Sequence, residues 1–135
     1  MRNLKKLVAL LVFGTTLASA QIVALAATST FNITVGAGEE DPMSKRTLKA
    51  GTPSYENRFY VTVTSMTPSD GAVGVESNIL NGPLGSEEII VYSGTQGASG
   101  AYNGTAPYDV YYYMKGRYAG SSIAPQINMG GRYTP

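Results

Sequence analysis

The chain has 135 residues, of which ten are Lys or Arg, nine are Asp or Glu and none is His or Cys, so its formal net charge is +1. Without His and Cys it has no Ser-His or Cys-His nucleophilic triad, no usual zinc ligand set and no disulfide. Only carboxylates, a lysine or a tyrosine remain for catalysis, so we expect a protein that is not an enzyme and uses no cofactor.

The first segment has the features of a secretory signal peptide. Three basic residues among the first six precede an apolar run over 7–13, and two A-x-A sites end at Ala20 and Ala26. A charged start, an apolar stretch and a small-residue site are typical of exported proteins, and a membrane anchor is the weaker alternative. We expect a signal-peptide helix within 1–26, cleavage after Ala26 or else after Ala20, and one secreted domain over 27–135.

Cleavage changes the charge of the domain. Three of the ten basic residues lie before residue 27, which leaves seven against nine acidic residues and a net charge of −2. A weakly acidic domain is a poor partner for nucleic acid or for an anionic membrane. The chain also lacks a cysteine for lipid attachment, so we expect an extracellular protein that does not bind the membrane after cleavage.

Short segments of alternating apolar and polar residues predict β-strands, because successive side chains of a strand point to opposite faces. The predicted strands are 31–35, 59–65, 73–80, 87–93, 108–118 and 123–133. Turns are predicted at 67–71 and 81–86 and a loop at 94–107, while 44–50 is either a short edge strand or a helical turn. The pattern indicates an all-β fold, a small antiparallel β-sandwich or barrel-like fold of about six or seven short strands.

The last two predicted strands are expected to form an antiparallel hairpin around 119–122, with paired residue numbers that sum to about 241. One face of this hairpin is apolar or aromatic. Tyr108, Tyr112 and Tyr118 belong to it, and each needs a hydrogen-bond partner for its hydroxyl. The other face is predicted to meet solvent. Its residues are Tyr111, Tyr113, Lys115, Arg117, Gln126 and Asn128.

This outward face is the candidate site for a ligand or partner. Tyrosine rings stack on sugar faces and aromatic ligands and are favoured at protein contacts. A cross-strand aromatic ladder that only stabilises the sheet is the alternative. The sequence M-x-G-R-Y occurs at 114–118 and again at 129–133, which we interpret as two similar strand ends that each contain a Gly.

The acidic residues suggest a second, weaker candidate site. Glu39, Glu40 and Asp41 lie together in a predicted loop and offer oxygen ligands for calcium, although without EF-hand spacing, and a solvated loop is the alternative. Basic residues are concentrated in 45–58 and 115–132, with none between. This distribution favours either opposed patches that promote self-association or dispersed, solvated charge.

A resemblance follows from the signal peptide, the cysteine-free domain, the tyrosine-rich segment VYYYMKGRY (110–118) and the final GRYTP (131–135). These features resemble the small secreted, cysteine-free β-proteins of Gram-positive bacteria. The resemblance is one of composition and implies no site residues. A looser similarity is to lactococcin-type secreted β-sandwich bacteriocins, although none of their motifs can be placed on this chain.

Three functions are compatible with these features. The first is a secreted, non-catalytic β-sandwich that binds an extracellular or cell-surface protein or glycan. The second is a bacteriocin-like antagonist or signal that acts on other bacteria. The third is a small carboxylate-dependent hydrolase. The third is the weakest, because Glu87 and Glu88 are adjacent in a predicted strand and leave it on opposite faces.

Overall fold

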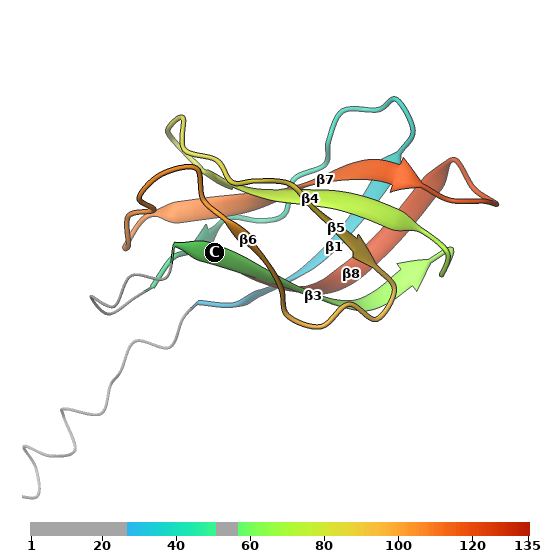
Figure 1. Ribbon diagram of the computed structural model, residues 1–135, viewed down its shortest axis with the longest axis horizontal. Helices are drawn as coiled ribbons and strands as arrows, with labels where there is room; N and C mark the ends of the chain where they lie inside the picture. Colours follow the sequence, from blue (N-terminus) through green and yellow to red (C-terminus); the bar gives the residue numbers. More distant parts are fainter. Residues whose placement is uncertain (1–26, 51–56) are drawn as a thin grey trace, which may run out of the picture.

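The computed structural model describes residues 27–50 and 57–135, and the predicted signal-peptide helix lies outside the described residues. The predicted all-β class is confirmed, since eight strands form two antiparallel four-stranded sheets that face each other (Figure 1). Across the described ranges, the chain has no helix of the length and apolar character that a membrane span requires.

A strand overlaps every predicted segment, and there are two more strands. The strand predicted at 87–93 begins after Glu87 and Glu88, and the strand predicted at 108–118 begins at Tyr111, later than predicted. β2 settles the ambiguity at 44–50 in favour of a short edge strand, and β6 lies within 94–107, where the prediction of a loop was wrong. The strands are β1 (Ser29–Gly36), β2 (Thr47–Leu48), β3 (Arg58–Thr67), β4 (Ala72–Ile79), β5 (Ile89–Tyr92), β6 (Ala98–Ala101), β7 (Tyr111–Gly120) and β8 (Gln126–Thr134).

The chain crosses repeatedly between the two sheets. One sheet, here the β8 sheet, has the order β1-β8-β3-β6, and the other, the β7 sheet, has the order β2-β7-β4-β5. Among consecutive strands only β4 and β5 are neighbours in one sheet. The core therefore forms between strands that are distant in the sequence, as in other sandwiches.

The predicted hairpin of the last two strands is wrong. β7 pairs with β2 and β4, whereas β8 pairs with β1 and β3. The connection between them passes from one sheet to the other, and the Asp70 carboxylate fixes it by accepting hydrogen bonds from the Ser122 N–H at 2.7 Å and the Ser121 hydroxyl at 2.9 Å. Alternation determines which face of a strand is buried, but it does not determine the partner strand.

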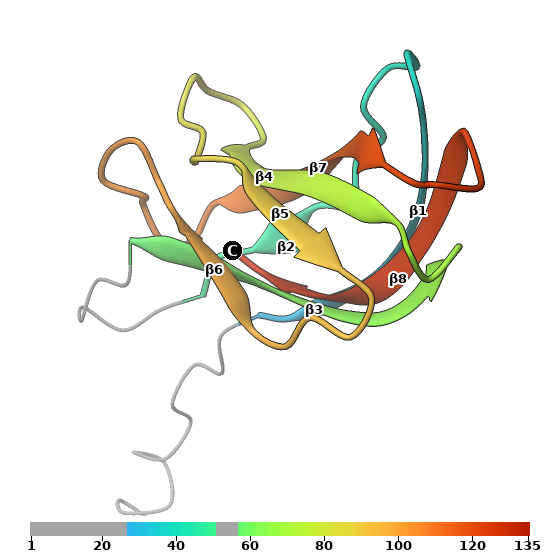
Figure 2. The same cartoon turned by 45° about the vertical axis from the view of Figure 1, so that its right-hand side comes forward.

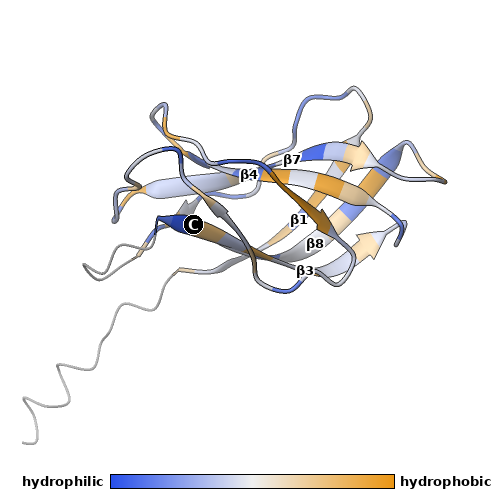
Figure 3. Cartoon of the chain, viewed as in Figure 1, coloured by the Kyte–Doolittle hydropathy of each residue, from blue (hydrophilic) through white to orange (hydrophobic). Residues whose placement is uncertain are grey.

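The middle parts of β7 and β8 nevertheless bury the residues that the sequence indicates, whereas Tyr108 and Tyr118 are only half-buried. Tyr112, Met114, Ile127, Met129 and Tyr133 have no exposed surface. Hydrophobic and hydrophilic bands succeed one another along the long strands in Figure 3. The two sheets thus contribute alternate side chains to one core between them.

The two M-x-G-R-Y segments place their glycines at equivalent inward positions. A Cβ on Gly116 would lie 2.6 Å from Cδ1 of Ile33, and a Cβ on Gly131 would collide with the Thr62 carbonyl oxygen and approach the Phe31 ring to 3.0 Å. The side chains of β1 therefore pack against both glycines, where a larger residue would not fit. Both glycines are buried in the core.

Candidate functional site

The six residues of the predicted outward face do not form one site. Tyr111, Tyr113, Lys115 and Arg117 lie on the outer face of the β7 sheet. Gln126 and Asn128 are exposed on β8, and therefore on the outer face of the opposite sheet. The prediction of one six-residue face depended on a hairpin of the last two strands, and these two strands lie in different sheets. Only the β7 residues can act together.

The two cations of β7 are held by carboxylates of the chain itself. The Lys115 Nζ lies 3.7 Å from the Asp41 carboxylate and 3.9 Å from that of Glu76. Arg117 donates two hydrogen bonds to the Glu88 carboxylate, at 2.9 and 2.6 Å. The hydrogen bond from Arg117 lowers the pKa of Glu88. Each cation of β7 is therefore paired with an acidic residue of the chain itself.

The acidic loop does not assemble the predicted calcium site. Within 27–50 and 57–135, no three acidic side chains converge in a way that would hold a metal ion. Asp41 turns instead to Lys115, and Glu39 folds back over Gly36. Glu39, Glu40 and Asp41 line a hollow of about 500 Å³ together with Met43 and Lys115.

Tyr111, the first residue of β7, is the more exposed of the two candidate tyrosines, since Tyr113 is only half-exposed. Its side chain is 43% exposed, and the Arg46 guanidinium carbon lies 5.0 Å from the ring centroid. This cation–π contact orients the ring without enclosing it. The Tyr111 carbonyl accepts a 2.9 Å hydrogen bond from the N–H of Leu80, so the end of β4 is tied to the start of β7.

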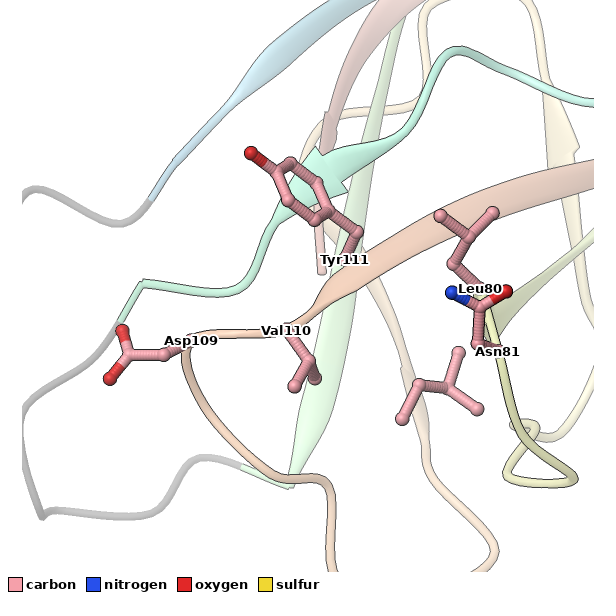
Figure 4. Close-up of a pocket in the computed structure, with 6 residues that line it drawn as sticks. Leu80, Asn81, Asp109, Val110 and Tyr111 are labelled. Carbon is pink, nitrogen blue, oxygen red and sulfur yellow. The ribbon is translucent and has the colours of Figure 1, made fainter.

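Beside Tyr111 lies a groove of about 260 Å³, and Figure 4 shows its lining side chains. Leu80 is 37% exposed at its margin, and Val110 packs partly against the core. The groove is lined by Ile79, Leu80, Asn81, Asp109, Val110 and Tyr111. An apolar surface thus meets the amide of Asn81, while the Asp109 carboxylate points away from Leu80 and Asn81 and lies at the margin of the groove (Figure 4). Apolar surface with a few polar groups is the combination typical of small ligand sites.

Asp109 has a backbone conformation that few residues adopt. Its φ is 58°, in the left-handed region, and its N–H donates a 2.9 Å hydrogen bond to the Lys49 carbonyl. Aspartate tolerates this region better than most residues. In the part of the chain that the structure describes, its carboxylate has no hydrogen bond or ion pair, and the amide of Asn81 has none either. Both residues are exposed.

Buried tyrosines and a lysine support the segment that carries the groove. Lys49, only 3% exposed, donates a 2.7 Å hydrogen bond to the Pro135 carbonyl and lies over the rings of Tyr102, Tyr108 and Tyr112. The Tyr112 hydroxyl donates to the Pro107 carbonyl at 3.0 Å. Burial, with a smaller contribution from Tyr108, raises the pKa of Tyr112 to about 12.

A second buried group joins the two sheets. The Ser77 hydroxyl on β4 lies 2.7 Å from the hydroxyl of Tyr102 and 2.6 Å from that of Tyr133 on β8. Burial raises the pKa of both tyrosines well above the ordinary value. These hydroxyls are buried, so they stabilise the core and cannot contact a ligand at the surface.

Sequence reasoning identified Tyr111 but missed the rest of the groove. Leu80 could have been identified from the sequence. It follows Glu76 and Asn78 at alternate positions, which point outward, and yet it is apolar. An exposed apolar residue on an otherwise polar face, here followed by an Asn-Gly turn, indicates a surface that binds a ligand or partner. Asp109 offered no such signal, because its left-handed conformation depends on tertiary contacts.

The groove beside Tyr111, with the polar side chains of Asn81 and Asp109 at its border, is thus the candidate site. Comparisons of the sequence with protein-family models and curated proteins, and of the fold with solved structures, give no match, so the site is defined by its geometry alone.

Proposed function

We propose that the chain is a secreted, non-catalytic binding module that holds an extracellular or cell-surface partner in the groove beside Tyr111. The observation that carries the proposal is an exposed aromatic ring next to an apolar hollow with two polar side chains that no residue of the described chain engages.

The size of the groove limits what enters it. Pockets for whole small ligands span about 300–1,000 Å³. The groove, at about 260 Å³, is slightly smaller. It suits one sugar ring or one side chain of a larger partner, with the remainder of that partner outside.

We favour a glycan as the partner. The face of the Tyr111 ring that Arg46 leaves open offers a flat surface for the apolar face of a sugar. The Asn81 amide can donate a hydrogen bond to that sugar, and the Asp109 carboxylate at the margin accepts hydrogen bonds from hydroxyls of the glycan that remain outside the groove. A protein side chain would use the apolar floor but would leave these polar groups without partners, which lowers affinity.

The test is retention on a panel of cell-wall and soluble glycans with matched variants. Tyr111→Ala removes the ring, and Asp109→Gly removes the carboxylate while keeping a residue that tolerates the left-handed backbone. Each is expected to reduce retention at least tenfold, about 1.4 kcal/mol, with a nearly unchanged melting temperature.

Tyr92→Ala is the control, because Tyr92 is a more exposed tyrosine, at 57%, on the same sheet. It pairs with Ala72, at the opposite end of β4 from Ile79 in the groove. Equal losses for Tyr111→Ala and Tyr92→Ala, or no retention of the unmodified protein on any glycan, would reject the glycan site. Retention of proteins alone would favour the protein partner.

A further inference from the structure

β1 forms an open edge of the β8 sheet. It lies beside β8 at the rim of that sheet (Figure 2) and pairs with β8 along all eight of its residues. In residues 27–50 and 57–135, the backbone of β1 makes no hydrogen bond to any other strand. Among those residues, no backbone group pairs with the outer edge of β1 along 29–35.

This edge lacks the features that normally protect one. β1 reads STFNITVG, with no charged residue, no proline and no register shift. Proteins usually guard long edges with lysine, proline, bulges or short strands. The β6 edge, by contrast, has four residues and is partly covered, since the Glu87 N–H donates to the Ala101 carbonyl at 2.9 Å.

The sequence of β1 is complementary to itself. In an antiparallel pair of two β1 strands centred on Asn32, Asn32 lies opposite its own copy and Thr30 lies opposite Thr34. On the inner face Phe31 lies opposite Ile33. Cross-strand Thr–Thr and aromatic–aliphatic pairs are favourable, and no like charges meet. The outward residues Thr30, Asn32 and Thr34 are all exposed.

The flanking charges fit the same arrangement. Glu39 and Glu40 follow the C-terminal end of β1, whereas Lys45 and Arg46 precede Thr47, whose hydroxyl lies 2.5 Å from that of Ser29 at the N-terminal end. An antiparallel pair brings the N-terminal end of one β1 to the C-terminal end of the other. Lys45 of one copy then approaches the acidic pair of its partner, while Arg46 keeps its contact with the Tyr111 ring.

We propose that β1 is a self-association edge, and that two copies of the chain pair antiparallel through β1 about a two-fold axis at Asn32. The two β8 sheets then become one continuous sheet across the dimer, as in other cases of strand addition. The contact leaves the Tyr111 groove of each copy on the outer face of its own β7 sheet, so this inference stands independently of the proposed function.

The first test is sedimentation of the purified protein at up to about 1 mM, a concentration at which even a millimolar Kd populates the dimer. We expect the mass to rise from one chain to two with concentration. Asn32→Lys places two cations opposite each other and is expected to weaken the dimer several-fold. Asn128→Lys is the control, because Asn128 is exposed on the adjacent strand, opposite Thr34.

A mixing experiment tests the register. Asn32→Lys and Asn32→Asp alone are each expected to dimerise several-fold more weakly than the unmodified protein, and an equal mixture is expected to regain the lost affinity through opposite charges at the two-fold axis. Melting temperatures of all variants establish that each is folded. A single-chain mass at every concentration, a dimer unaffected by Asn32→Lys, or equal losses for Asn32→Lys and Asn128→Lys would overturn the proposal.

Discussion

Arg117 on β7 and Glu88, directly before β5, form a two-bond ion pair that passes over β4. The pair crosses β4 at Gly74, where an added Cβ would lie 2.7 Å from the Glu88 carboxyl carbon. The absent side chain at Gly74 thus lets a carboxylate reach a strand that is not its neighbour.

This geometry predicts an acid-dependent coupling between the two residues. The pKa of Glu88 is lowered by Arg117 from an ordinary value of 4.5, so the pair stabilises the fold above that pH and its contribution is lost as the pH falls through the folded pKa. In a double-mutant cycle with Glu88→Gln and Arg117→Gln, the coupling should be favourable at neutral pH and vanish in acid. A coupling that is unchanged by acid would contradict the ion pair.

Gly131 and Gly116 should differ in their tolerance of a methyl group. Gly131→Ala drives a Cβ into the Thr62 carbonyl, which is backbone, and should cost about 3 kcal/mol or more. Gly116→Ala meets the tip of Ile33 at 2.6 Å, a side chain that can shift, and should cost about 1–2 kcal/mol.

Chemical denaturation of both variants measures these costs. Gly104→Ala is the control, because its nearest neighbour is the side chain of Leu84 at 3.3 Å. Its free energy of unfolding should change by less than about 0.5 kcal/mol. A larger loss of unfolding free energy for Gly116→Ala than for Gly131→Ala would contradict the described packing of the two glycines.

These glycines also show what the sequence could and could not predict. Alternation in β7 and β8 correctly predicted that Tyr112, Met114 and Met129 enter the core, because side-chain direction is a local property of a strand. Tyr108 and Tyr118, predicted on the same face, are only half-buried, because Tyr108 precedes β7 and Tyr118 lies near its end. Alternation could not predict that β7 joins β4 while β8 joins β3, because partner choice depends on contacts between distant segments. The same limit explains why Tyr111 was identified as a site residue and Asp109, positioned by Lys49, was not.

Ser77 should be more costly to remove alone than together with its partners. Ser77→Ala leaves the buried hydroxyls of Tyr102 and Tyr133 without a shared partner and should lower the free energy of unfolding by about 1–3 kcal/mol. Adding Tyr102→Phe and Tyr133→Phe removes the unpaired groups and should recover part of that loss. A triple variant less stable than Ser77→Ala would show that the hydroxyls find other partners.

The buried tyrosines predict loss of stability in alkali. Burial raises the pKa of Tyr112 from 10.0 to about 12, so the unfolded chain gives up a proton that the folded chain keeps. Stability is then retained below pH 10 and lost progressively as the pH rises toward about 12. Denaturation at a series of alkaline pH values should show this fall, and Tyr112→Phe should make it shallower. An equal slope in both proteins would contradict the burial of this hydroxyl.

The most direct test of the groove as a binding site is an NMR titration of the ¹⁵N-labelled protein with a soluble glycan that the panel retains. Amide shifts that change at 79–81 and 109–111, with no change around Tyr92 or along β8, are the predicted result. Shifts confined to the outer face of the β8 sheet, or spread evenly over the molecule, would contradict the assignment of the groove beside Tyr111.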